Sequence, residues 1–332
     1  MLVGDFPNEE AEERGHAFGG ASGWMLDQLL AGAGIARSEC YTTNVFSIRP
    51  RPSLDIKSFC GAKADAIPAM PDVGRGRYVR AEYSPHLTRL YKEVSDEKPN
   101  IVVALGPIAV WAFLYTAGIK AVRGAVATSH PTVARKLGHN QKIIPTYHPA
   151  MILRDSSQRP VAIADLGKAR RENEFTECIR PSRSIWLYPD IEDLERFEHE
   201  HIIPATLLSV DIETKGDQIT CIGFSTSPSV CLVIPLFQGD NGNYWALADD
   251  EHRALNYIAR WLTLRPSVFQ HGMYDVKFLW RRYGIPTPLA LEDTMLLHHA
   301  WQPEMEKGLG FLGTLYTSEP SWKFMRKGKR HD

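Results

Sequence analysis

The first half of the chain alternates between short apolar runs and helix-like patterns. Runs typical of buried strands lie at 1–3, 41–46, 101–105 and 142–147. Between them, 22–34 and 85–94 have helical spacing or helix-start signals. This alternation predicts a mostly parallel sheet covered by helices, with function at the carboxyl ends of the strands.

The second half has a different pattern. Three short runs rich in β-branched residues and separated by tight turns predict an antiparallel meander at 207–212, 219–226 and 230–236. A helix at 250–262, a strand at 267–270 and a helix at 274–283 are predicted to follow. This order favours a mixed sheet with helices packed against it.

A polar, charged stretch at 169–189 separates the two halves, and 332 residues suffice for two domains. We therefore place a first domain at 1–172, a linker at 173–182 and a second domain at 183–332. The predicted fold class is α/β throughout, with a parallel-sheet αβα domain followed by a mixed-sheet domain.

Composition adds few constraints. The formal net charge is −1, so any contact with nucleic acid must come from local patches. Five scattered cysteines without a C-x-x-C pair argue against a disulfide framework and favour a reducing compartment, which predicts a cytoplasmic protein. The uncharged segment 101–119 is interrupted by Gly106 and Pro107, so we interpret it as a strand, turn and helix and expect no membrane partner.

Three acidic residues in the second half suggest a metal site. Asp211 and Glu213 lie at the end of the first run of the meander, at positions i and i+2, which point to one face of a strand. Asp275 lies at the start of a later helix. Three such carboxylates can hold Mg²⁺ or Mn²⁺ against a phosphodiester. In the alternative interpretation the first two only solvate a strand end, and Asp275 caps a helix.

The segments SVDIET, FQHGMYDVKFL and LEDTMLLHHAWQPEMEKGLGFLGTLYT resemble the proofreading 3′→5′ exonuclease domain of phage-type family A DNA polymerases, which has an RNase H-like fold. The resemblance implies that Asp211, Glu213 and Asp275 are catalytic metal ligands and that Asp293 is structural. His271 stands where the family usually has Asn. The family's third motif, Tyr-x-x-x-Asp, is not found before Asp332. We therefore expect an incomplete exonuclease domain that is weak or inactive in isolation.

In the first half, four residues lie at or near predicted strand ends and provide groups that base excision needs. Asp5 can polarise a water and Phe18 can stack on a base. Asn44 can donate to and accept from a uracil edge, and His148 can donate a hydrogen bond to the departing uracil. Taken singly, each has a plain structural alternative: a turn residue, a core ring, a turn former and a loop histidine.

In order and spacing, the segments GDFPNEEAEERGHAFGGASGWMLDQLLAGAGI, TNVFSIRPRP, VVALGPIA and TYHPAMILR resemble the uracil-DNA glycosylase superfamily, and family 4 in particular. The resemblance implies a catalytic role for Asp5 and His148, and base binding by Phe18 and Asn44. Asn8 stands where a glycine is usual beside the flipped base. The family's four-cysteine set is broken here, so we expect no iron–sulfur cluster.

The same order of modules occurs at the front of some phage family A polymerases. The resemblance therefore implies a DNA replication or repair protein, encoded by a phage and located in the host cytoplasm. Its expected partner is DNA, either single-stranded or at a primer terminus. Two functions stay open: an enzyme with uracil-DNA glycosylase and proofreading exonuclease activities, and a non-catalytic scaffold that binds single-stranded DNA or uracil and needs a separate polymerase chain.

Overall fold

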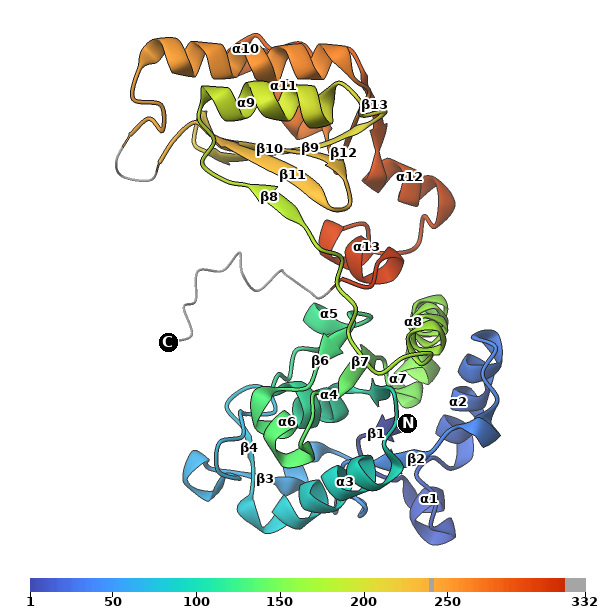
Figure 1. Ribbon diagram of the computed structural model, residues 1–332. Coiled ribbons are helices and arrows are strands. Elements are labelled where there is room, and N and C mark those ends of the chain that lie inside the picture. The colour runs from blue at the N-terminus through green and yellow to red at the C-terminus, as the bar shows by residue number, and fades with distance from the viewer. Residues whose placement is uncertain (239–241, 320–332) are drawn as a thin grey trace. The chain divides into compact units, whose positions relative to one another are not determined.

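The computed structural model describes residues 1–238 and 242–319. The chain divides into two compact units, the first comprising residues 1–179 together with the segment from Gly310, and the second Arg180–Leu309 (Figure 1). Residues 320–332, the end of the second domain as predicted, lie outside the described residues.

The first unit is built on a five-stranded sheet in the order β2-β1-β5-β7-β6. Its strands are β1 (Leu2–Gly4), β2 (Thr42–Asn44), β5 (Val102–Leu105), β6 (Ala127–Thr128) and β7 (Lys142–Thr146). All pairs are parallel except β6 with β7. The mostly parallel sheet that the sequence predicts is thus confirmed. Two short strands, β3 (Cys60–Gly61) and β4 (Tyr78–Val79), pair antiparallel in a region for which the sequence analysis predicts no element.

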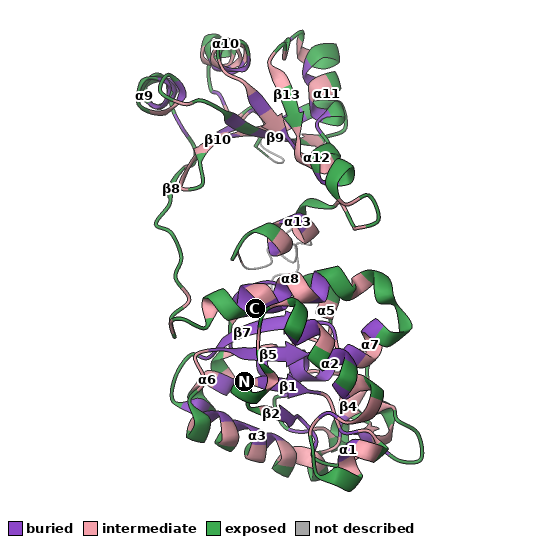
Figure 2. Ribbon diagram, turned by 90° about the vertical axis from the view of Figure 1, so that its right-hand side faces the viewer, coloured by how far each residue is buried: buried purple, intermediate pink, exposed green. Residues whose placement is uncertain are grey.

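Helices cover both faces of this sheet. They are α1 (Glu9–Arg14), α2 (Gly20–Gly32), α3 (Ser84–Glu97), α4 (Pro107–Leu114), α5 (Ile119–Val122), α6 (Pro131–Leu137), α7 (Pro149–Arg154) and α8 (Arg159–Glu172). Figure 2 shows the buried strands between α8 and α3. The apolar segment 101–119 forms β5 and α4, which are buried in the core of this unit, because Gly106 turns the chain and Pro107 begins the helix. No helix among the described residues is long and apolar enough to span a membrane.

The second unit contains a six-stranded mixed sheet in the order β13-β12-β9-β10-β11-β8. Its strands are β8 (Ser184–Trp186), β9 (Leu208–Lys215), β10 (Gln218–Ser227), β11 (Val230–Pro235), β12 (Ser267–Phe269) and β13 (Ala290–Asp293). The meander β9-β10-β11 is antiparallel, whereas β12 pairs parallel to both β9 and β13. Its helices are α9 (Ile191–Phe197), α10 (Ala248–Leu264), α11 (Met273–Tyr283) and α12 (Thr294–Trp301). The predicted α/β fold class with a mixed second sheet is confirmed.

Two details differ from the sequence prediction. Strand β9 continues to Lys215, so Asp211 and Glu213 lie within the strand rather than at its end. Helix α13 (Leu309–Tyr316) belongs with the first unit, although the prediction assigned it to the second domain. The reason is a set of buried polar contacts that α13 makes with Arg123, which follows α5, and with Lys168 on α8. Local patterns in the sequence do not contain such long-range contacts.

Candidate functional site

A cavity of about 470 Å³ opens in the first unit, next to the carboxyl ends of β1 and β7. Asp5, Phe18 and His148 all line it. Asp5 follows β1, and His148 follows β7 by two residues, so the parallel sheet brings together two side chains that are far apart in the sequence. Three of the four residues predicted for base excision thus share one cavity.

Asp5 is held by the start of helix α4. Its Oδ1 accepts hydrogen bonds from the backbone N–H groups of Ile108 (3.1 Å) and Ala109 (3.0 Å). Gly106, with φ +107°, permits this approach, because a Cβ there would lie only 2.7 Å from Asp5 Oδ1. Burial raises the pKa of Asp5 to about 7, while the two amide hydrogen bonds act in the opposite direction. Asp5 therefore titrates in the neutral range, where a group that activates water is most useful.

His148 is the N-cap of helix α7. Its Nδ1 accepts a hydrogen bond from the backbone N–H of Ala150 at 3.1 Å. Burial lowers the pKa of His148 to about 4, and the positive charge of Arg154 adds to the effect. The ring is therefore neutral near pH 7, and because Nδ1 is an acceptor, the proton is assigned to Nε2. His148 is a neutral hydrogen-bond donor at the cavity wall.

Asn44 and Phe18 lie against Gly4 at the end of β1. A Cβ on Gly4 would lie 2.4 Å from Asn44 Oδ1 and 2.6 Å from Phe18 Cζ, so only glycine leaves room for both side chains. The Asn44 Nδ2 donates to the carbonyl of Ala17 at 2.7 Å. Asn44 Oδ1 is buried and has no hydrogen-bond partner among the described residues. Asn44 does not line the cavity itself, but its acceptor lies beside the Phe18 ring that does.

Two further residues contribute to this site: Asn8, which the sequence analysis places beside the flipped base without giving it a role, and Arg154, which it does not single out. Asn8 caps α1 by accepting from Ala11 N–H (2.8 Å), and its Nδ2 donates to the carbonyl of Gly19 at 3.0 Å. This bond ties the loop after β1 to the residue that follows Phe18. The exposed Arg154 lines the cavity and adds a positive charge, although it ends the TYHPAMILR segment without any distinguishing local pattern.

In the second unit, the acidic residues gather around β9. Asp211 and Glu213 are both exposed, while Val210 and Ile212 between and beside them are buried, as strand alternation requires. Asp275, in the first turn of α11, is buried and accepts a hydrogen bond from the backbone N–H of Ile212 at 3.1 Å. This N–H is available because the pairing of β9 with β12 ends at Ser209.

The pKa of Asp275 is raised to about 6, mainly by burial and in smaller part by the negative charge of Asp211, while the hydrogen bond from Ile212 acts in the opposite direction. Carboxylates that oppose each other's ionisation form a place where a cation would be stabilised. Asp293 keeps the preceding turn in place, because its carboxylate accepts the N–H groups of His271 (3.1 Å) and Gly272 (2.8 Å). It also caps α12, which agrees with the structural role implied for it.

Within residues 1–238 and 242–319, no group of three or more His, Cys, Asp or Glu side chains is arranged to hold a metal ion. The side chains of Asp211, Glu213 and Asp275 therefore share a region of β9 without forming a ready-made three-ligand site. The cysteines Cys40, Cys60, Cys178, Cys221 and Cys231 are all free thiols. The predicted Mg²⁺ or Mn²⁺ site and the predicted lack of an iron–sulfur cluster both stay predictions.

A sequence profile described as "Uracil DNA glycosylase superfamily" matches residues 1–180, more than half of the chain. The chain belongs to the uracil-DNA glycosylase superfamily. Similar proteins include the type-4 uracil-DNA glycosylase of Thermotoga maritima, 29% identical over 51% of this chain and 75% of the relative. The type-4 enzyme of Pyrobaculum aerophilum is 27% identical over 48% of this chain and 70% of its own length.

Solved structures that resemble part of the chain are nucleases. One, described as the apo form of the nuclease, is 16% identical, with a TM-score of 0.27 over 40% of this chain and 58% of its own. An EXD2 exonuclease domain soaked in Mg is 14% identical, with a TM-score of 0.28 over 40% of this chain and 68% of its own. The Aedes aegypti Nibbler EXO domain is 10% identical, with a TM-score of 0.33 over 43% of this chain and 73% of its own. Likeness at this level establishes no function, so the function of the second unit has to be argued from its own residues.

Proposed function

We propose that the first unit binds a flipped uracil in the cavity lined by Asp5, Phe18 and His148 and excises it from DNA. The observation that carries this proposal is that Asp5, Phe18 and His148 line one cavity, beside which Asn44 Oδ1 is buried and has no hydrogen-bond partner among the described residues. Since Nδ2 is already bound to Ala17 O, the amide presents a fixed acceptor. Uracil N3–H is a donor and satisfies it, whereas the N3 of cytosine is an acceptor and would leave two acceptors facing each other.

Excision needs more than binding, and Asp5 and His148 provide the additional groups. In its ionised form, Asp5 polarises the attacking water and stabilises positive charge that develops on the sugar. The neutral His148 donates from Nε2 to the uracil oxygen on which negative charge accumulates. Phe18 lines the cavity, with its ring centroid 5.8 Å from that of His148, and offers an apolar face for stacking. Stacking of one base is worth roughly 1–3 kcal/mol.

A binding titration tests this function. Single-stranded oligonucleotides that contain uracil, cytosine or thymine are titrated with the wild type and with Asn44→Ala, and abasic sites are counted in parallel. The matched control is Asn100→Ala, because Asn100 also donates its amide to a backbone carbonyl, that of Asn173, but lies outside the cavity. We expect Asn44→Ala alone to weaken uracil binding. Equal affinity for uracil and cytosine, unchanged by Asn44→Ala, would refute the proposal.

For the second unit we infer a divalent-metal-dependent 3′→5′ exonuclease. Oxygen ligands suit Mg²⁺ and Mn²⁺, and Asp211, Glu213 and Asp275 supply three carboxylates around one stretch of β9. A bound metal ion would neutralise phosphodiester charge and lower the pKa of a coordinated water. The protein's own part is positioning: α11 and the Ile212 amide hold Asp275 in place, and Tyr274 hydrogen-bonds to Thr214 at 2.7 Å.

Mn²⁺ binding, followed by calorimetry, tests this site without depending on catalysis. Asp211→Asn should weaken binding, whereas Asp249→Asn, an exposed carboxylate at the start of α10, should not. Metal-dependent digestion of single-stranded DNA, abolished by Asp211→Asn, would extend the result to activity. If Asp211→Asn leaves Mn²⁺ affinity unchanged, Asp211 is not a ligand and the proposed metal site is refuted.

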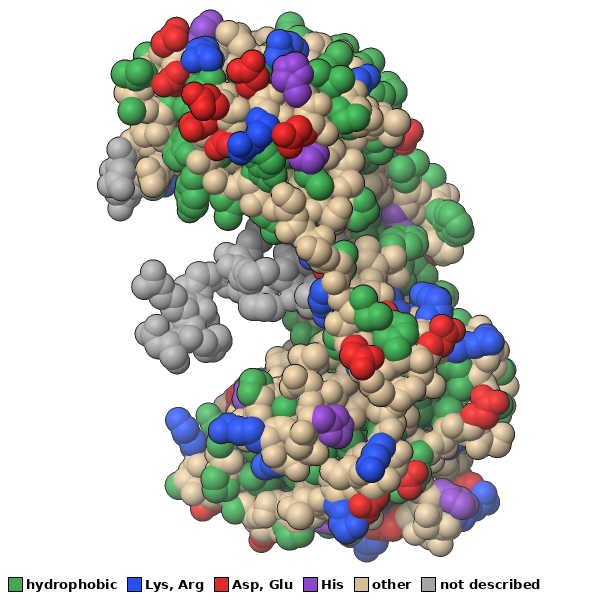
Figure 3. Space-filling view, in the orientation of Figure 1, with side chains coloured by type: hydrophobic (Ala, Val, Ile, Leu, Met, Phe, Trp, Pro, Cys, Tyr) green, Lys and Arg blue, Asp and Glu red, His purple; other side chains and the backbone are tan. Residues whose placement is uncertain are grey.

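A second candidate function is a scaffold that binds DNA without cutting it. The observation that favours it is that none of the described residues form a three-ligand metal group. In that case the wild type would bind single-stranded DNA with equal affinity in the presence of Mn²⁺ and of a chelator. Figure 3 shows acidic and basic side chains intermixed on the face in view, so such binding would rely on local contacts. A separate polymerase chain as partner remains a proposal of the same kind.

A further inference from the structure

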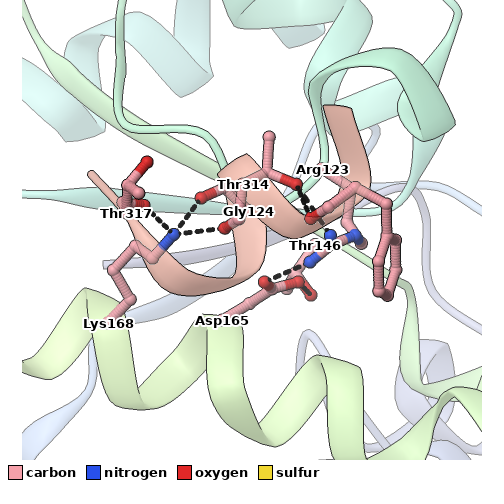
Figure 4. Close-up of polar contacts among 8 residues, drawn as sticks. Arg123, Gly124, Thr146, Asp165, Lys168, Thr314 and Thr317 are labelled. Carbon is pink, nitrogen blue, oxygen red and sulfur yellow. Dashed lines mark hydrogen bonds and ion pairs between the residues drawn. The ribbon is translucent and has the colours of Figure 1, made fainter. Parts of the chain in front are cut away.

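Helix α13 follows the whole second unit in sequence but is part of the first unit. Figure 4 shows its residues at the surface of α8, where they meet side chains from the segment after α5. Thr314, on α13, is buried, as are Arg123, Asp165 and Lys168. A buried cluster of three ionisable groups needs nearly complete pairing to be tolerated, so each contact in it matters.

Arg123 contacts both α8 and α13. Its Nη1 forms an ion pair with Asp165 Oδ1 at 2.5 Å, and its Nη2 donates to Thr314 Oγ1 at 2.8 Å. The guanidinium also lies 4.7 Å from the centroid of the Phe311 ring, a cation–π contact. Without α13, Arg123 would lose two of these three partners.

Lys168 depends on the same segment. Its ammonium donates to the carbonyls of Gly124 (2.7 Å), Thr317 (2.6 Å) and Thr314. The last turn of a helix carries partial negative charge, so the carboxyl end of α13 stabilises the buried ammonium of Lys168. Arg123 and Lys168 carry two positive charges against the single carboxylate of Asp165, and the carbonyls of α13 offset the excess.

The cluster also reaches two walls of the uracil cavity. Asp165 Oδ2 accepts a hydrogen bond from Thr146 Oγ1 at 2.7 Å, at the end of β7 and two residues before His148. Arg123 directly follows α5, whose first residue, Ile119, lines the cavity. The Gly124 N–H donates to Pro145 O at 2.7 Å, which joins the two walls. A change at α13 can therefore reach the cavity through Arg123, Asp165 and Thr146 on one route, and through Arg123 and α5 on the other.

We propose that α13 is a clamp of the glycosylase unit: by docking on Arg123, Asp165 and Lys168 it holds α5 and the end of β7 in the geometry that binds the base. Recognition of uracil in the first unit then depends on a segment that lies beyond the entire second unit in sequence. Arg123 and Thr314 are positioning residues in this scheme. The ligand's identity rests on the proposed function, whereas the clamp itself does not.

Hydrogen exchange in the full chain tests the clamp directly. Leu312→Asp places a charge at a buried position of α13, and Leu309→Asp places the same charge at the exposed start of the same helix. We expect Leu312→Asp to accelerate hydrogen exchange in 119–126 and 142–148 by roughly tenfold or more, because these segments open locally when α13 undocks. Helix α3 should stay protected, which would show that the unit as a whole remains folded. Leu309→Asp should leave these segments unchanged. Unchanged exchange in both segments when α13 itself exchanges freely would overturn the clamp.

A milder variant covers the case in which Leu312→Asp unfolds the unit and α3 also loses protection. Thr314→Val removes the hydrogen bond to Arg123 with little change in shape. It should raise exchange in the same two segments and leave α3 protected. No change in either segment would then refute the proposal.

Uracil affinity separates failure of the clamp from failure of the proposed function. If the wild type binds uracil, Leu312→Asp should weaken binding about tenfold, in line with local opening of the walls, and Leu309→Asp should not. Faster exchange in a protein that binds no uracil would support the clamp and refute the proposed ligand. Wild-type affinity in Leu312→Asp, with α13 undocked, would refute the clamp and leave the ligand standing.

Discussion

Asp5 and Asp275 are the same chemical group in two different settings. Each is the carboxylate on which its unit's proposed chemistry depends, and each accepts backbone N–H groups, Asp5 from α4 and Asp275 from β9. The pKa of both is raised, to about 7 and about 6, with burial as the main cause. Only the pKa of Asp275 is also raised by a neighbouring carboxylate, that of Asp211.

This difference separates two kinds of acid site. An isolated, desolvated carboxylate such as Asp5 is suited to proton transfer near neutral pH, because it changes its charge there. A carboxylate next to others of its kind, such as Asp275, is suited to bind a cation, because a positive charge relieves their repulsion. The same substitution, Asp to Asn, should therefore have different effects at Asp5 and at Asp275.

The largest effect is expected for Asp5→Asn on excision. The amide keeps an oxygen that can accept from α4 but cannot take up a proton, so excision should fall by about 10²- to 10⁴-fold, with uracil binding largely intact. In the wild type, the excision rate should rise as pH passes through about 7, where Asp5 ionises. Abasic-site formation measured against pH tests both points. Asp275→Asn is the control and should excise normally; equal loss in both variants would remove the distinction.

The next effect concerns Mn²⁺ and the free energy of unfolding. At a concentration about 100 times the Kd, Mn²⁺ should stabilise the wild type by about 2.7 kcal/mol. Asp275→Asn should lose most of this gain, and Asp5→Asn should retain it. Thermal unfolding with and without Mn²⁺ measures the difference. Stabilisation that survives in Asp275→Asn would mean that the ion binds elsewhere.

Two glycines, one in each unit, sharpen the comparison further. A Cβ on Gly106, at φ +107°, would lie 2.7 Å from Asp5 Oδ1, whereas a Cβ on Gly223, which pairs with Asp211 in the sheet, would lie 3.9 Å from Asp211 O, its nearest neighbouring atom. Gly106→Ala should cost roughly 1–3 kcal/mol of unfolding free energy. Gly223→Ala should stay within about 0.5 kcal/mol of the wild type. Denaturant titration measures both, and similar costs would show that the first site is no more tightly packed.

The last effect is the pH dependence contributed by His148. Its pKa is about 4 in the folded protein against 6.5 for the free side chain, so between these values the unfolded chain binds more protons. The free energy of unfolding should therefore increase as pH rises from 4 to 6.5. His148→Asn, which can still cap α7, should reduce this increase. An unchanged slope would indicate that His148 is not desolvated.

Much of the first site could be predicted from local sequence. Asp5 and His148 adjoin strands whose apolar pattern is clear, and parallel strands place their carboxyl ends at one edge of the sheet. The orientation of Asn44 could not be predicted, because it depends on a hydrogen bond to Ala17, 27 residues away, and on the missing Cβ of Gly4. The raised pKa of Asp5 likewise depends on burial beneath α4, about a hundred residues later in the chain.

In the second unit, strand alternation alone put Asp211 and Glu213 on one face, as the structure has them. The sequence by itself determined the order of elements, the two sheet types and the residues that could carry chemistry, because these follow from local periodicity and residue type. Only the tertiary structure decided where α13 belongs. Its position depends on contacts such as Arg123 with Thr314, 191 residues apart, and the pairing of buried charges over such a distance leaves no local pattern in the sequence.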